Sequence, residues 1–310
     1  MARSGKGAGR RTLRVDPREA GTRLDLFLVG AVEGLSRKRA KRWIDARRVW
    51  VDGRIEAMAS RVLRGGERVE VEPEPPAPSR GEPPPIPVIL ENGVLLAVAK
   101  PPGIPSGPTR DPGRPHVQGI LEAARGEPLV LVHRLDKDTT GVLLLARTPE
   151  AGAALVRAFR ERRVEKTYLA LVRGRPPRAF EVVSHLREGE GRVHTVRSGG
   201  MRSQTRFETV ASSGGFALVR ARPRTGRMHQ IRVHLAREGF PILGDPVYGG
   251  AAEVAGRPVP RQMLHALVLE VPHPAGGGQV RIVAPVPGDF RETAARALGP
   301  GVARRALRPR

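Results

Sequence analysis

Apolar residues recur with two different periods along the chain, and the first segments have the period of a helix. In residues 23–32, Leu24, Phe27 and Leu28 fall on one helical face. Residues 37–45 continue with the same period, and Ser36 is suited to cap the helix that they would form. Short strand-like segments follow at residues 49–51 and 68–72. These elements predict a small α/β domain.

From residue 88 onward most apolar segments have the length or the alternation of strands. Helical spacing appears only in residues 150–163, around residue 231 and in residues 291–298. The predicted strands are 88–90, 94–99, 129–132, 142–146, 169–172, 180–187, 192–197, 204–211, 217–221, 263–271 and 279–284. Because strands and helices do not alternate as βαβ units would, the order predicts an α+β fold with a mainly antiparallel or mixed sheet.

Proline separates these two regions. Eight of the sixteen residues from 72 to 87 are proline, which cannot pair inside a sheet and favours extended, semi-rigid chain. We therefore predict a domain at 22–72, a linker at 73–87 and a larger domain at 88–290. Residues 1–21, with six basic and two acidic residues and little to bury, are predicted to be a disordered basic arm. Residues 291–310 are predicted to be a basic C-terminal tail.

Composition narrows the class of partner. The formal net charge is +23 and the pI is about 11.6, with the basic residues spread along the whole chain, which favours a polyanionic partner. The absence of cysteine excludes disulfides and thiolate metal sites. No apolar run is long enough for a membrane span or a signal peptide, so we expect a soluble, cytoplasmic protein with no membrane partner. No obligate protein partner is evident.

Motifs for cofactors and metals are missing as well. The sequence contains no phosphate-binding glycine loop, no HExxH and no nucleophile elbow, so no cofactor is predicted. His229 and His234 are five residues apart, a spacing that does not place both on one metal from a single helix. We interpret them as core or hydrogen-bonding histidines.

One face of the second predicted helix is strongly basic. Between residues 36 and 48 there are seven basic residues and one acidic residue. A cationic helix face is often only solvated, but this density favours contact with phosphates. The residues predicted to bind RNA here are Arg37, Lys38, Lys41 and Arg42.

Residues 133–147 combine an acid, turn residues and a buried strand. Asp136 lies two residues after Arg134 and just before the apolar run 142–146. A carboxylate on a turn before a core strand is held rigidly yet stays reachable, as a catalytic acid or nucleophile must be. Taken alone, an Asp near an Arg is usually a surface ion pair.

The N-terminal region resembles the S4 RNA-binding domain over residues 22–72. The resemblance rests on two short helices, the basic face and the VxVDG hairpin at residues 49–53. Arg47 stands where that family often has glycine, at the end of the second helix. The resemblance implies that this region binds RNA.

The larger region resembles the RluA family of RNA pseudouridine synthases over residues 88–290. HRLDKDTTG at 133–141 is similar to the family's catalytic segment, with Thr140 where serine is usual. KTYLALVRG at 166–174 and TGRMHQIRVHLAREGFPILGDPVYGG at 225–250 are similar to two further segments. The motifs follow one another in the family's order, behind an RNA-binding module. The resemblance implies isomerisation of uridine to pseudouridine without a cofactor.

The resemblance also assigns roles to residues. Asp136 is implied as nucleophile or base, and Arg227 as the guanidinium that keeps it ionised in a site closed to water. Tyr168 is implied to face the uracil, with Ile231 packing against the other side of the site. Arg134 is implied as the wedge that replaces a flipped base.

The RNA partner is expected to be ribosomal, most readily of the large subunit, with transfer RNA left open. Two other functions remain possible from the sequence. The chain could be an RNA-binding or ribosome-assembly factor without turnover. Less readily, it could be an RNA glycosylase, which also uses a carboxylate at C1′.

Overall fold

The computed structural model describes residues 10–45, 47–72, 85–109, 111, 113–189 and 191–307, apart from the side chains of Lys38 and Arg42. The chain divides into two units, Met1–Glu82 and Pro83–Arg310, which are described separately. This division falls within the predicted linker, most of which lies outside the described residues. None of the described helices is long and apolar enough to cross a lipid bilayer.

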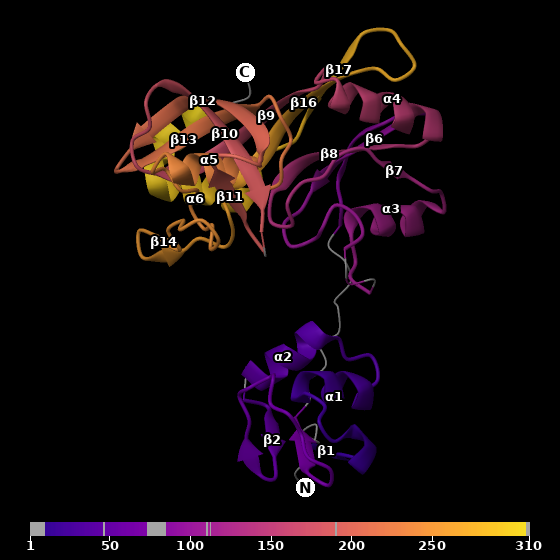
Figure 1. Ribbon diagram of the computed structural model, residues 1–310. Coiled ribbons are helices and arrows are strands. Elements are labelled where there is room, and N and C mark those ends of the chain that lie inside the picture. The colour runs from indigo at the N-terminus through magenta and orange to yellow at the C-terminus, as the bar shows by residue number, and fades with distance from the viewer. Residues whose placement is uncertain are drawn as a thin grey trace, which may run out of the picture. The chain divides into compact units, whose positions relative to one another are not determined.

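The N-terminal unit packs two helices and a 3-10 turn against a four-stranded sheet (Figure 1). Its strands have the order β1-β4-β2-β3, and all three pairings are antiparallel. The elements are β1 (Arg11–Arg14), η1 (Pro17–Glu19), α1 (Leu24–Ala31), α2 (Arg37–Asp45), β2 (Val49–Val51), β3 (Arg54–Ile55) and β4 (Arg68–Val71). Leu24, Leu28, Ile44, Val49 and Val71 lie in a single buried core.

The prediction of a disordered arm was wrong for residues 11–21. β1 pairs along its whole length with β4, and Val15, just beyond it, is buried in the core. Asp16 and Glu19 then form a capping box around the 3-10 turn. The short alternation of Leu13 and Val15 was hidden among basic residues, and β4 supplies backbone partners that no local pattern indicates. Residues 1–9 lie outside the described part of the chain.

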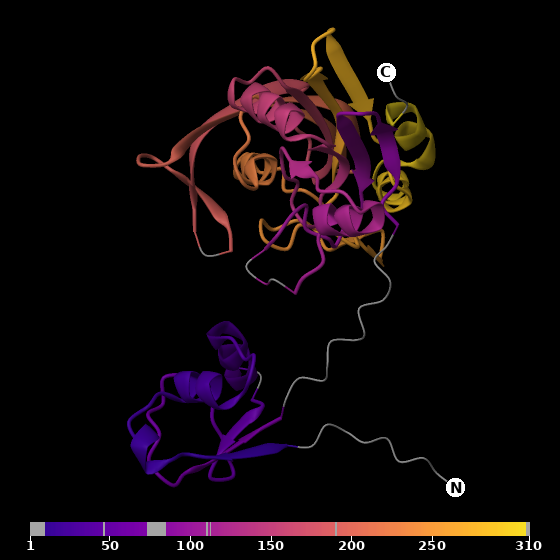
Figure 2. The ribbon, with the colours of Figure 1, turned by 90° about the vertical axis from the view of Figure 1, so that its right-hand side faces the viewer.

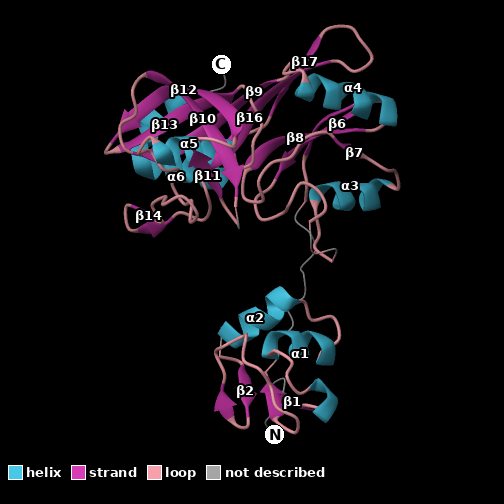
Figure 3. Cartoon of the chain, viewed as in Figure 1, coloured by secondary structure: helices cyan, strands magenta, loops and turns pink. Residues whose placement is uncertain are grey.

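The C-terminal unit is built on one large mixed sheet, which confirms the predicted α+β class (Figure 3). The strand order is β11-β10-β12-β13-β9-β16-β8-β6-β5, with β17 beside β16 and β7 beside β8. These strands are β5 (Val88–Glu91), β6 (Leu95–Lys100), β7 (Val130–Leu131), β8 (Thr140–Ala146), β9 (Glu165–Arg173), β10 (Ala179–Glu188), β11 (Val193–Val196), β12 (Met201–Ser213), β13 (Phe216–Pro223), β16 (Leu264–Pro272) and β17 (Gln279–Val283). A separate small hairpin joins β14 (Glu253–Val254) to β15 (Arg257–Pro258).

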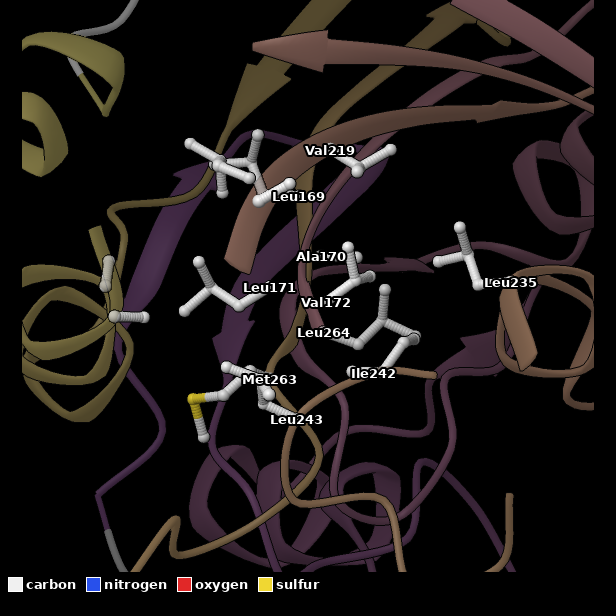
Figure 4. Close-up of a cluster of buried hydrophobic side chains, with 14 of the residues drawn as sticks. Leu169, Ala170, Leu171, Val172, Val219, Leu235, Ile242, Leu243, Met263 and Leu264 are labelled. Carbon is white, nitrogen blue, oxygen red and sulfur yellow. The ribbon is translucent and has the colours of Figure 1, made fainter. Parts of the chain in front are cut away.

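Helices cover both faces of this sheet (Figure 2). They are α3 (Val117–Arg125), α4 (Pro149–Arg160), α5 (Gln230–Arg237), α6 (Gly288–Leu298) and α7 (Pro300–Ala306). The largest core cluster joins β9, β13 and β16 to α5 and α6, and Figure 4 shows Leu171, Leu235 and Ile242 among its members. Burial of this apolar surface is the main driving force for the fold of the unit.

The C-terminal segment is part of this domain, so the prediction of a tail was wrong for residues 291–307. Phe290, Ala294 and Leu298 of α6 and Ala303 of α7 are buried in the same core cluster. The many arginines of this segment obscured its small apolar stripe. Residues 308–310 lie outside the description.

The relative orientation of neighbouring strands changes at β16, next to the candidate site. β16 runs parallel to β8, with Ala266 opposite Gly141, and antiparallel to β9, with Ala266 opposite Tyr168. Gly141 has φ +119, and a Cβ there would overlap the backbone of Ala266. Only glycine therefore allows β8 to approach β16 so closely. Segments far apart in sequence meet here.

Candidate active site

The loop that carries Asp136 is fixed to the core from several sides. Ser106 donates its hydroxyl to the carbonyl of Leu135 and accepts the Leu135 N–H, at 3.0 and 2.9 Å. His133 accepts the N–H of Leu144 at 3.0 Å through Nε2 and stacks on Phe159. Because Leu135 is bonded to the buried Ser106 and His133 to strand β8, the carboxylate has a defined position while its side chain stays 24% exposed.

Lys100 also stabilises the loop that carries Asp136. The ammonium is buried, and it donates to the carbonyls of Pro101, Lys137 and Thr139 at 2.8, 2.8 and 3.0 Å. Three acceptors use all three protons of a charged lysine. Burial lowers the pKa of Lys100 to about 7, and the negative charges of Asp138 and Asp136 oppose this shift. The turn after Asp136 therefore depends on one buried cation.

Arg232 is the guanidinium that binds Asp136. Its Nη1 donates to Asp136 Oδ2 at 3.0 Å, while its Nε and Nη2 donate to the two oxygens of Asp245 at 2.7 and 2.9 Å. Burial opposes the charge of Arg232, but the hydrogen bonds and charges of Asp245 and Asp136 hold its pKa above the ordinary value. Among the described residues, Arg232 is the hydrogen-bond donor to the Asp136 carboxylate, and it uses Oδ2 and not Oδ1.

Asp245 locks this guanidinium in place. Its side chain is fully buried and accepts the backbone N–H groups of Val247 and Tyr248 as well as the two bonds from Arg232. A bidentate pair of this kind fixes both distance and plane. Arg232 therefore reaches Asp136 as a rigid, permanently charged donor.

The prediction that Arg227 is the counter-ion of Asp136 was wrong. Arg227 lies before α5, where its Nε donates to the carbonyl of Arg202 at 3.5 Å and its backbone N–H donates to the Gln230 side chain. His229 then adopts a left-handed conformation, with φ 53°, and α5 begins at Gln230. Because the backbone turns at His229, the first turn of α5 brings Arg232 to Asp136. Arg232 stands in the same motif, but sequence spacing could not reveal the left-handed residue between the two arginines.

Tyr168 lies close to the loop that carries Asp136, and its contact with the uracil stays a prediction. It projects from β9 opposite Ala221 of β13 and Ala266 of β16, and it packs against both neighbouring core clusters. Burial raises the pKa of its hydroxyl, and the negative charge of Asp136 raises it further. The phenol therefore stays protonated near neutral pH.

The other predicted residues of the large domain are also placed by the structure. Arg134 is exposed and donates to the carbonyl of Pro108 at 3.2 Å, which leaves its guanidinium at the surface next to Asp136. Ile231 is buried in the core with Leu235, only 6% exposed. Its contact with a substrate base stays a prediction.

Two aromatic residues complete the site: His229, predicted as a core or hydrogen-bonding histidine, and Tyr248, which the sequence did not single out. His229 Nδ1 lies 3.0 Å from the hydroxyl of Tyr248, and its Nε2 lies 3.9 Å from Asp136 Oδ2. His234, in contrast, is enclosed by Ser184, Ser203 and Thr205, so the prediction of a hydrogen-bonding core histidine is confirmed for it. Among the described residues, no group of three His, Asp or Glu side chains could hold a metal ion.

The basic face predicted on α2 is described only in part. Lys41 is exposed, whereas Arg37 donates to the buried Asp25 at 3.0 Å with its side chain still 61% exposed. The side chains of Lys38 and Arg42 lie outside the described residues. Arg47, at the end of α2, has φ 57°, the conformation for which glycine is better suited.

Comparisons with known proteins agree with this geometry. The family model described as RNA pseudouridylate synthase matches residues 94–237, and the S4 domain model matches residues 22–69. A protein of Chloroflexus aurantiacus named "Uncharacterized RNA pseudouridine synthase" is 36% identical, over 92% of each chain. Two proteins named "Ribosomal large subunit pseudouridine synthase D" are also similar. That of Xanthomonas campestris is 36% identical over 90% of this chain and 92% of its own, and that of Haemophilus influenzae is 33% identical over the same shares.

Solved structures show the same likeness. The structure titled "Human RNA Pseudouridylate Synthase Domain Containing 4" superposes with a TM-score of 0.57 at 27% identity, covering 72% of this chain and 93% of its own. "Human RNA Pseudouridylate Synthase Domain Containing 1" superposes with a TM-score of 0.55 at 27% identity, covering 66% of this chain and 84% of its own.

Proposed function

Because the chain belongs to the RNA pseudouridine synthases, we propose that it converts specific uridines to pseudouridine in large-subunit ribosomal RNA, with Asp136 as the reacting carboxylate. The geometry of Asp136 and Arg232 is the observation that carries this assignment. Arg232 is fixed by the buried Asp245, so it presents a rigid, permanently charged donor to Asp136 Oδ2. Asp136 Oδ1 is then free to meet C1′ of a uridine.

The reaction needs a carboxylate and a protected site. The bond between C1′ and N1 breaks, the base turns, a bond forms between C1′ and C5, and the proton on C5 is exchanged for one on N1. Asp136 acts as nucleophile at C1′ or as base in this sequence. Tyr168, kept protonated by burial, offers an aromatic face and a hydroxyl donor to the uracil.

A uridine in duplex or folded RNA can reach Asp136 only after its base leaves the stack. Arg134 is exposed two residues before Asp136, so its guanidinium can occupy the space of the extruded base. The S4 unit adds a basic surface with Lys41 exposed, and the net charge of +23 supports binding to a polyanion. The names of the two bacterial relatives favour large-subunit ribosomal RNA over transfer RNA.

The test uses the full chain and unmodified large-subunit ribosomal RNA carrying tritium at C5 of uridine. We expect tritium release and pseudouridine at defined positions, and loss of both with Asp136→Asn. Equal activity of Asp136→Asn would refute the role of Asp136. Release from transfer RNA alone would refute the RNA class.

The main alternative is an RNA-binding factor without turnover. It predicts tight, salt-dependent binding of the same RNA with no tritium release by the wild-type protein. Free uracil among the products would instead indicate a glycosylase. The buried Arg232–Asp245 pair, which presents a fixed cation to Asp136, favours the enzyme.

A further inference from the structure

The hydroxyl of Tyr248 has three contacts that together fix its hydrogen bonds. The N–H of Val193 lies 2.8 Å away and can only donate, while the carbonyl of Val193 lies 3.3 Å away and can only accept. His229 Nδ1 lies at 3.0 Å as the third partner. A phenol has one proton and two acceptor positions.

The hydrogen-bond partners of the Tyr248 hydroxyl indicate which tautomer His229 adopts. The N–H of Val193 occupies one acceptor position of Tyr248, and the carbonyl of Val193 takes the phenol proton. All three contacts can be hydrogen bonds at once only if the remaining position accepts, which places the His229 proton on Nδ1. Its Nε2 then has a free lone pair, and that atom lies 3.9 Å from Asp136 Oδ2.

The surroundings keep this imidazole unprotonated before the reaction. Burial lowers the pKa of His229, and the charge of Arg232 acts in the same direction. The carboxylates of Asp136, Asp245 and Glu188 oppose this effect. A neutral imidazole beside a carboxylate that is about to gain a proton is arranged to accept it.

The backbone at His229 supports a functional placement. Its φ of 53° is unfavourable for a residue with a Cβ, and the structure holds it there through Gln230. The Gln230 side chain accepts from Thr225 and from the backbone N–H of Arg227, and donates to Thr205 and to the carbonyl of Gln204. This set of bonds maintains the unfavourable conformation that points the ring at Asp136.

We propose that His229 is a further catalytic residue, whose Nε2 takes from Asp136 the proton released from C5. The proposal rests on the proposed function. Once C1′ is bonded to C5, the C5–H bond breaks and its electron pair forms the C5=C6 bond, while the C6=N1 pair moves to N1. Asp136 receives the proton and passes it to Nε2. N1 takes a proton from water, and the imidazolium returns one to water.

Tyr168 is the competing acceptor near the base. Its pKa is raised by burial and by the charge of Asp136, so it stays a phenol and cannot retain a further proton. The imidazole of His229 lies with Nε2 3.9 Å from Asp136 Oδ2, and the hydroxyl of Tyr248 positions it through Nδ1.

The key variant is His229→Asn, because asparagine tolerates a left-handed backbone and its amide can replace Nδ1 as donor to Tyr248. RNA with hydrogen or deuterium at C5 of the target uridine is used in single-turnover reactions. We expect the rate of pseudouridine formation to fall about 100-fold or more. We also expect a primary isotope effect larger than that of the wild type, partial rescue by imidazole and loss of the acidic limb of the pH profile.

Tyr248→Phe is the matched variant for positioning, since it keeps the imidazole and removes only the hydroxyl. It should reduce the rate less than His229→Asn and keep the acidic limb. A His229→Asn rate within threefold of the wild type would overturn the proposal, as would a slow variant with unchanged isotope effect and no rescue. A wild-type protein that forms no pseudouridine would refute the proposed function itself.

Discussion

Arg232 and Asp136 are 96 residues apart in sequence and form an ion pair of 3.0 Å at the junction of two parts of the sheet. The junction exists because β16 pairs with both β8 and β9, which brings the loop before β8 next to the side chains of β9. Helix α5 then places Arg232 next to Asp136. Three segments that are each stable for their own packing reasons therefore assemble one carboxylate with one fixed cation.

The first prediction distinguishes the two arginines of the α5 motif. Arg232→Lys should lower the single-turnover rate at least 100-fold, because a lysine cannot bind Asp245 in a bidentate manner and also reach Asp136. Breaking the buried pair with Asp245 should also cost about 3–5 kcal/mol in the free energy of unfolding. Arg227→Lys is the matched control and should keep the chemical rate. The reverse result would restore Arg227 as the counter-ion.

The choice between Arg227 and Arg232 also shows which features of the site could be predicted from the sequence and which could not. The order of strands and helices predicted the α+β class, and the family resemblance singled out Asp136 and Tyr168, because each of its motifs is local and carries its chemistry in a few adjacent residues. The choice between Arg227 and Arg232 depends on one left-handed residue, His229, whose φ of 53° is imposed by the Gln230 bonds to β12. No local propensity indicates that conformation.

The errors at the two ends of the chain have a related cause. Residues 11–14 and 300–306 each carry a single large apolar side chain, Leu13 and Val302, and their order comes from partners elsewhere in the sequence. β1 is completed by the edge of β4, and α7 is completed by α6 and β12. Composition records only what a segment contains, so it placed the first in a disordered arm and the second in a basic tail.

A second prediction concerns Lys100, which donates to three carbonyls around the catalytic turn. Lys100→Met keeps the buried stem and removes the donors. We expect the rate of the chemical step to fall on the order of 100-fold, because a small displacement of the loop misplaces Asp136. RNA affinity should stay the same. Quench-flow and filter-binding measurements separate the two quantities.

Lys137→Met provides the control for Lys100, since its exposed side chain belongs to the same turn while only its carbonyl takes part. It should leave the chemical rate unchanged and weaken RNA binding slightly at low salt. A Lys100→Met protein with the wild-type rate would show that the turn holds Asp136 without the buried cation.

The third prediction tests the junction of β8 and β16. Gly141→Ala should destabilise the C-terminal unit by about 3 kcal/mol or more, because the added Cβ meets the backbone of Ala266 and φ is +119°. Gly93→Ala, in an open turn with no atom within 4 Å of the added Cβ, should change stability by less than about 0.5 kcal/mol. Urea unfolding followed by circular dichroism measures both. Equal stability of the two variants would contradict the close approach.

The last prediction is a loss of stability in mild acid. Burial lowers the pKa of His133 to about 3 and those of His234 and His265 to about 4, all below the ordinary value of 6.5. As the pH falls through 6.5, these histidines bind protons in the unfolded chain but not in the folded one, so stability decreases toward pH 4. One pKa unit corresponds to about 1.4 kcal/mol, so each should cost about 2 kcal/mol at pH 5 relative to pH 7. Unfolding by urea at both pH values should show this difference for the C-terminal unit. His234→Gln should reduce the difference by about a third, whereas His185→Gln, at an exposed position, should leave it unchanged. An equal response of the two variants would show that the acid sensitivity arises from other groups.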